Sequence, residues 1–138
     1  MLFKSLSIQG GYFMIKYIPQ STDLTCGQAC VAMLANISIE EAINKMGTDG
    51  STEPIDIING LEACGVKCDD AFVKITNENP SYPPICVLLV WFPNYGHWLV
   101  HYNGKFYDPE FGLMDECAPN GRIGAYLSVY LEEGNENE

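Results

Sequence analysis

The chain has 138 residues, 47% of them hydrophobic, which suffices for one domain with its own core. Its formal net charge is -11 and its seven Lys and Arg residues are scattered, which excludes a nucleic-acid binder, because such proteins cluster basic side chains against phosphates. The longest apolar run, residues 85–92, is too short to span a bilayer, so no membrane partner is expected.

Residues 1–14 are predicted to be an extension ahead of the domain, or a strand added at a sheet edge, with Met14 as an alternative start. They lack the uninterrupted apolar stretch of a secretory signal, which predicts a cytoplasmic protein. The domain is expected to span residues 15–131. Residues 132–138 are acidic and are expected to be a disordered tail.

Three helices are predicted in the first half of the chain. Residues 24–35 are apolar and rich in small side chains, which indicates a buried helix with Cys26 at its start. Residues 38–41 read Ser-Ile-Glu-Glu, a capping-box pattern that opens a second, short helix ending near Gly47. Residues 51–54 supply a cap, an acid and a proline, and so indicate the start of a third.

From residue 66 onward the pattern is typical of strands, which are predicted over residues 66–75, 85–92, 98–102, 105–108 and 123–131. Asn103-Gly104 lies between two of them and predicts a tight hairpin turn. The expected fold is therefore α+β, with N-terminal helices packed on a C-terminal antiparallel sheet.

Cys26 is the candidate nucleophile. The positive end of a helix dipole favours the reactive thiolate at that position, and Gly27 is expected to leave room for a substrate backbone. The alternative interpretation is a small buried core thiol.

Gln20 lies six residues before Cys26, and the intervening turn can bring its side-chain amide beside the Cys26 backbone N–H. Two donors aimed at one point would form an oxyanion hole. Gln28 is the rival donor, but we expect it to point off a helix that has already begun.

His97 is the candidate base, since imidazole transfers protons near neutral pH. His101 competes for this role, because residues four apart share one face of a strand. We favour His97, since Gly96 is expected to keep its approach open, and we expect Trp98 to point into the core.

Asp108 is the candidate acid that orients the imidazole. The hairpin at residues 103–104 returns the chain so that Asp108 ends close to His97, where a carboxylate fixes the tautomer. Asp115 and Glu110 are the weaker alternatives.

The six cysteines could form three disulfides, but a cytoplasmic chain of this length is expected to keep them reduced. Two pairs are four residues apart, Cys26 with Cys30 and Cys64 with Cys68, which suggests a zinc site. Zinc knuckles usually place two residues between their thiolates rather than three, so neither a metal nor a cofactor is expected.

Several motifs together resemble the bacteriocin-processing (double-glycine leader) peptidase-like domains of the papain-like cysteine peptidase clan, over about residues 15–130: Gln20 with Cys26-Gly27, residues 29–34, 38–41 and 47–52, Gly96-His97-Trp98 and Tyr107-Asp108-Pro109. The resemblance implies a papain-like fold, with Cys26 as nucleophile, His97 as base, Asp108 as orienting acid and Gln20 as oxyanion donor. Thr25 stands where the family usually has Asp.

The expected function is that of a cysteine peptidase or related thiol hydrolase acting on a peptide or protein substrate. Two alternatives stay open. One is an acyltransferase that uses the same site, and the other is a catalytically silent peptide-binding module. The sequence leaves the substrate and the oligomeric state undetermined.

Overall fold

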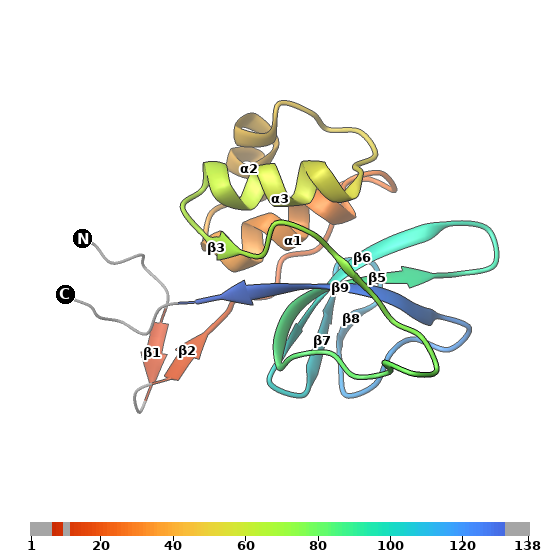
Figure 1. The fold of residues 1–138 in the computed structure, drawn as a ribbon. Helices are drawn as coiled ribbons and strands as arrows, with labels where there is room; N and C mark the ends of the chain where they lie inside the picture. The colour runs from red at the N-terminus through yellow and green to blue at the C-terminus, as the bar shows by residue number, and fades with distance from the viewer. Residues whose placement is uncertain (1–6, 10–11, 132–138) are drawn as a thin grey trace.

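Three helices lie over one face of a seven-stranded antiparallel sheet in the described part of the chain, residues 7–9 and 12–131 (Figure 1). The structure is a computed structural model. The helices precede the sheet strands in the chain, which confirms the predicted α+β class. The predicted acidic tail, residues 132–138, lies outside the described residues.

The central helix α1 (Cys26–Ala35) is buried at every residue after Cys26. Apart from Gln28, its side chains are small or apolar, as is required of a helix that is covered on all sides. Helix α2 (Ile39–Met46) begins with the predicted capping box: the Ser38 hydroxyl accepts a hydrogen bond from the Glu41 N–H at 3.0 Å, and Glu41 Oε1 accepts one from the Ser38 N–H at 3.0 Å.

Helix α3 (Pro54–Ala63) is capped by Glu53, rather than by the hydroxyl residues 51 and 52 that the sequence offers. Proline at the first helical position sets the start of the helix, because its fixed φ suits that position and its missing N–H costs nothing there. The Glu53 N–H then donates to Asp56 Oδ2 at 2.8 Å.

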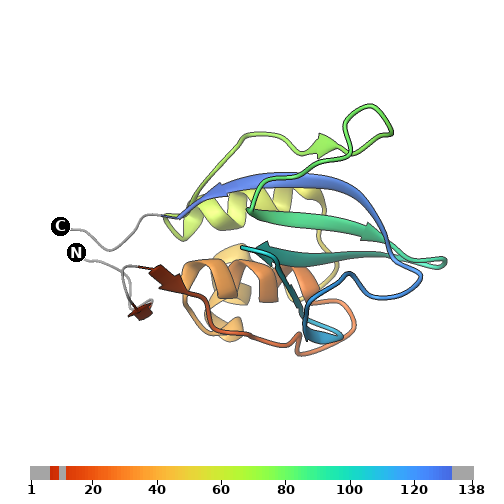
Figure 2. The same cartoon turned by 90° about the horizontal axis from the view of Figure 1, so that it is seen from below.

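The large sheet has the strand order β3-β9-β5-β6-β7-β8, and β4 also pairs with β9. Figure 2 shows the long strand β9 passing between β5 and the short strand β4. The strands are β3 (Lys67–Cys68), β4 (Val73–Lys74), β5 (Ile85–Trp91), β6 (Gly96–Tyr102), β7 (Lys105–Asp108), β8 (Gly112–Met114) and β9 (Arg122–Tyr130).

Two strand predictions need correction. The single strand predicted over residues 66–75 is wrong, because β3 and β4 are separate two-residue strands. Asp69 and Asp70 lie between them, and Asp is disfavoured in strands. The sequence did not predict β8, which is three residues long and begins at Gly112 with φ of 105°.

Strands β1 (Ser7–Gln9) and β2 (Tyr12–Met14) pair with each other in a separate two-stranded sheet. Neither of these two strands pairs with the main sheet, while residues 1–6 and 10–11 of the predicted extension lie outside the described residues. Among the described residues, no helix combines the length and the apolar character needed to cross a membrane.

The hairpin between β6 and β7 places the candidate acid. Asn103 has φ of 50° and Gly104 has φ of 90°, the left-handed conformations that a tight two-residue turn requires, so this turn is confirmed. Val100 pairs with Tyr107, which sets Asp108 beside the β6 segment that holds His97. Trp98 belongs to the core between helices and sheet, as predicted.

Candidate active site

Cys26 is the first residue of α1 and is only half-buried, unlike the rest of the helix. The loop before it is held by Thr25, a fully buried residue whose hydroxyl oxygen accepts hydrogen bonds from the N–H groups of Ser21 at 2.9 Å and Thr22 at 3.0 Å. The N–H groups of a first helical turn have no partner within the helix. The Cys26 backbone N–H is therefore a candidate donor for a substrate oxygen.

His97 and Asp108 form a buried pair. His97 Nε2 and Asp108 Oδ1 are 2.7 Å apart, and the two side chains are 2% and 0% exposed. Because Nε2 faces the carboxylate, Nδ1 is the ring nitrogen left for a nucleophile or a substrate. The Cys26 side chain lies close enough to the imidazole to raise its pKa.

These contacts set the charge of the imidazole. Burial by itself lowers the pKa of His97, but the hydrogen bond with Asp108, the nearby Cys26 side chain and the negative charges of both groups outweigh it and raise the pKa from 6.5 to about 9. His97 is therefore protonated at neutral pH, the form that stabilises a neighbouring thiolate and can give a proton to a leaving amine.

Hydrogen bonds from the turn that follows Asp108 and from Tyr17 fix its position. Its Oδ1 also accepts hydrogen bonds from the N–H groups of Glu110 at 2.8 Å and Phe111 at 3.1 Å, while its carbonyl accepts one from the Tyr17 hydroxyl at 2.6 Å. Its Oδ2 is buried without a hydrogen-bond partner. Three hydrogen bonds besides the one with the imidazole, two on Oδ1 and one on the carbonyl, therefore hold Asp108 in place.

Gln20 lies next to this turn. Its backbone N–H donates to the Pro109 carbonyl at 3.0 Å, and its side-chain Oε1 is buried without a partner. The rival Gln28 is fully buried and donates through Nε2 to the carbonyls of Thr48 and Gly50, each at 2.9 Å. The Gln28 amide thus holds the loop between α2 and α3, which leaves Gln20 as the candidate oxyanion donor.

Of the four residues predicted from the sequence, Cys26 begins α1 and His97 lies at the start of β6. Asp108 ends β7, and Gln20 belongs to the segment that is hydrogen-bonded to the turn after β7. Neither the protein-family models nor the curated proteins contain a match to this chain. What the site can do is therefore inferred from its own geometry.

His101 has a different environment from His97. It is 8% exposed, its Nδ1 lies 2.9 Å from the Pro84 carbonyl, and burial is the main cause that lowers its pKa. The rings of Tyr82 and Phe106 lie edge-on to it, each at 5.0 Å. A neutral, carbonyl-bonded histidine among aromatic rings is a structural residue, so the preference for His97 is supported.

The predictions that Gly27 and Gly96 leave space for a substrate are wrong. A Cβ at Gly27 would lie 2.2 Å from Thr52 Oγ1, and a Cβ at Gly96 would lie 2.9 Å from the Trp91 ring. Protein atoms therefore fill both spaces, and neither glycine opens a path for substrate. Both allow close packing: Gly27 lets α1 approach the segment before α3, and Gly96 lets the indole lie across β6.

The other thiols are poor nucleophiles. None of the six cysteines, all of which lie in the described residues, forms a disulfide. Burial is the main cause that raises the pKa of four of them: Cys30 well above its usual value, Cys68 to about 11, Cys86 to about 12, and Cys117. Cys64 is buried. Across the described residues, no group of three or more His, Cys, Asp or Glu side chains could hold a metal ion.

Sequence reasoning missed an aromatic cluster around His97. The rings of Phe92, Tyr95 and Phe111 lie 6.0, 6.2 and 6.2 Å from the imidazole. Glu110, considered only as a substitute for Asp108, has its Oε1 3.9 Å from His97 Nδ1. The signal that could have found them is proximity in sequence, since all four lie within five positions of His97 or Asp108.

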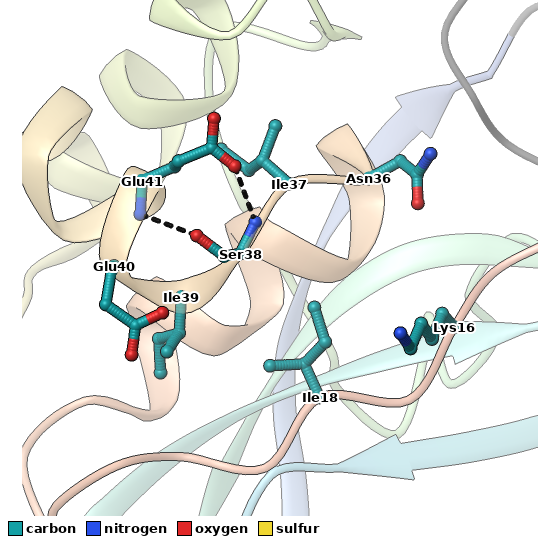
Figure 3. A pocket seen from close by; sticks show the side chains of 8 residues that line it. All are labelled: Lys16, Ile18, Asn36, Ile37, Ser38, Ile39, Glu40 and Glu41. Atoms are coloured by element: carbon teal, nitrogen blue, oxygen red, sulfur yellow. Dashed lines mark hydrogen bonds between the residues drawn. The ribbon is translucent and has the colours of Figure 1, made fainter.

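A hollow of about 410 Å³ lies elsewhere, where α1 ends and α2 begins (Figure 3). It is lined by Lys16, Ile18 and residues 36–41, and the capping box of α2 forms one side of it. At a rise of 1.5 Å per residue, the length of α1 separates it from Cys26 by roughly 15 Å. It is not part of the candidate active site.

Asp108→Asn is expected to lower the pKa of His97, because the change removes the negative charge that holds the imidazolium. NMR titration of the His97 ring protons should give a midpoint near pH 9 in the wild type and a clearly lower one in the variant. An unchanged midpoint would show that Asp108 does not govern the proton on His97.

The same shift links protonation to folding. The pKa of His97 is about 9 in the folded protein and 6.5 in the unfolded chain. Protonation of His97 therefore stabilises the fold fully below about pH 6.5, and this stabilisation is lost as the pH rises through 9. It amounts to about 3 kcal/mol at most. The stability advantage of the wild type over Asp108→Asn, measured by urea unfolding, should therefore shrink between pH 6.5 and 9.5.

Proposed function

We propose that this chain is a small cysteine peptidase with a papain-like fold, in which Cys26 attacks the carbonyl of a peptide or amide bond. The observation that carries the proposal is the buried His97–Asp108 pair, whose imidazole has its pKa raised in part by the half-buried Cys26 at the start of α1. The resemblance to bacteriocin-processing peptidase-like domains implies the same roles.

The first half of the reaction forms an acyl-enzyme. The Cys26 thiolate attacks the carbonyl carbon and forms a C–S bond. The Cys26 backbone N–H and the Gln20 amide donate to the oxyanion. The C–N bond then breaks while the His97 imidazolium gives its proton to the leaving nitrogen, so that the amine departs neutral and a thioester remains.

The second half releases the acid. The now neutral His97 takes a proton from water, whose oxygen attacks the thioester carbonyl. The C–S bond breaks, the carboxylic acid leaves, and the thiolate–imidazolium pair is restored. Asp108 keeps the ring oriented throughout. The proposal places the protein in the cytoplasm, where reducing conditions would keep Cys26 free.

Gln20→Ala is expected to lower kcat by roughly 10²-fold to 10³-fold, or about 3–4 kcal/mol, with little change in KM. An oxyanion donor acts on charge that develops only in the transition state, so its loss falls on kcat. Steady-state kinetics on one peptide substrate measures both constants. A raised KM with unchanged kcat would make Gln20 a substrate-positioning residue instead.

A peptide-library digest tests the proposal. Wild-type protein should release new amino termini, and the Cys26→Ala variant should release none. Peptides that bind with measurable isotherms but are never cleaved would instead favour the silent peptide-binding module.

An acyltransferase that uses the same residues is the second candidate, because an amine can replace water as the attacking group. Glu110 beside His97 Nδ1 favours it, since a carboxylate there would attract a cationic acceptor. Release of a model thioester that accelerates with added amine, and yields the amide, would identify this activity.

A further inference from the structure

The candidate active site has one distinctive wall, made of Phe92, Tyr95, Glu110 and Phe111, which we call the aromatic rim. Tyr95 is 44% exposed and Phe111 is 47% exposed, so both rings present open faces. Phe92 stacks on Tyr95 at 5.1 Å and lies 5.7 Å from Phe111. The Tyr95 hydroxyl donates to Glu110 Oε1 at 2.9 Å, which holds the carboxylate beside the phenol oxygen.

The nitrogen of His97 that donates the proton determines where the leaving group binds. Nε2 is bound to Asp108, so the leaving nitrogen must approach Nδ1 to about 3 Å to receive its proton. Glu110 Oε1 is 3.9 Å from the same Nδ1. The first residue on the leaving side of the scissile bond therefore lies within reach of the aromatic rim.

The chemistry of the rim fits a cation. Aromatic faces attract Lys and Arg side chains, and a carboxylate forms charge-assisted hydrogen bonds with them. One carboxylate offers about four acceptor positions, so the bond from Tyr95 leaves capacity for a ligand. Within the described residues, His97 is the one basic group recorded within 4 Å of Glu110. The net charge of -11 adds long-range attraction for a basic substrate.

We propose that the aromatic rim is the leaving-group subsite, and that it selects substrates with Lys or Arg directly after the scissile bond. The inference rests on the proposed function, because it takes Nδ1 as the proton donor to the leaving amine. The competing explanation is that Glu110 acts only on His97 as a positioning residue, in which case the leaving side chain makes no difference.

Binding of product-like ligands tests the subsite without turnover. The Cys26→Ala protein is titrated with Lys-Ala amide and with norleucine-Ala amide, which share the α-amine and differ in the charge of the side chain, and binding is followed by NMR. We expect the Lys ligand to bind about tenfold tighter, and Glu110→Gln, added to Cys26→Ala, to abolish this preference. Equal affinities, or no binding of either ligand, would overturn the inference.

A matched control sharpens the result. Asp115→Asn also removes one negative charge, but from an exposed residue paired with Lys105, and it should keep the tenfold preference. If Asp115→Asn abolishes the preference as Glu110→Gln does, overall charge explains it and the subsite does not. If Glu110→Gln weakens both ligands equally, Glu110 is a positioning residue and the inference fails.

A separate experiment distinguishes failure of the proposed function. Wild-type protein is treated with a peptidyl thioester and the acyl adduct on Cys26 is sought by intact mass. An adduct together with equal ligand affinities contradicts only the subsite. If no adduct forms but the Lys ligand still binds more tightly, the proposed function is contradicted, and the aromatic rim is a site that binds basic ligands without catalysis.

Discussion

Cys26→Ala should abolish peptide turnover, with a loss on the order of 10⁶-fold, while the fold stays intact. No other thiol can replace it, because burial raises the pKa of Cys30, Cys68 and Cys86 and keeps these thiols protonated. Turnover of a library-derived peptide and the near-ultraviolet circular dichroism spectrum measure the two parts of this prediction.

Cys117→Ala is the matched control, since Cys117 is also half-buried and free. It should keep wild-type turnover. Activity that survives Cys26→Ala but not Cys117→Ala would move the nucleophile to the loop before β9.

His97→Ala should cost nearly as much activity as Cys26→Ala, because the thiolate loses its partner and the leaving amine loses its proton donor. The double variant should be little worse than either single one, since the residues of one catalytic unit are strongly non-additive. The kcat values of the three variants on one substrate test both statements.

Folding has to be controlled in this series. His97→Ala leaves the Asp108 carboxylate buried without its imidazole partner, which destabilises the fold. His97→Gln keeps a donor for that carboxylate and should be equally inactive. His101→Asn keeps a donor for the Pro84 carbonyl and should stay active. The opposite pattern for the two histidines would show that the base is His101.

The sequence predicted those elements whose signals are local. The capping box at Ser38 and Glu41 and the turn at Asn103-Gly104 each depend on a few adjacent residues, and both are present in the structure. The buried helix after Cys26 has no polar face, which indicates burial without any knowledge of its partners. Because the turn sets the register of β6 and β7, the meeting of His97 and Asp108 could also be predicted.

Features that depend on distant residues could not be predicted. The spaces beside Gly27 and Gly96 are filled by Thr52 and Trp91, and no local pattern shows which side chain will occupy a space. The orientation of Glu110 toward Nδ1 depends on its bond with Tyr95, from another hairpin. The Gln28 amide holds the loop around Thr48 through two carbonyls that are twenty or more residues away, and no local pattern indicates that role.

Limited alkylation tests the central claim most directly, because it needs no substrate. Native protein is treated with limiting iodoacetamide, and the adducts are mapped by peptide mass across the six cysteines. The account predicts one dominant adduct, on Cys26, whose rate of formation falls in His97→Gln because the imidazolium no longer stabilises the thiolate. Preferential labelling of Cys64 or Cys117, or a Cys26 rate that does not change in His97→Gln, would contradict it.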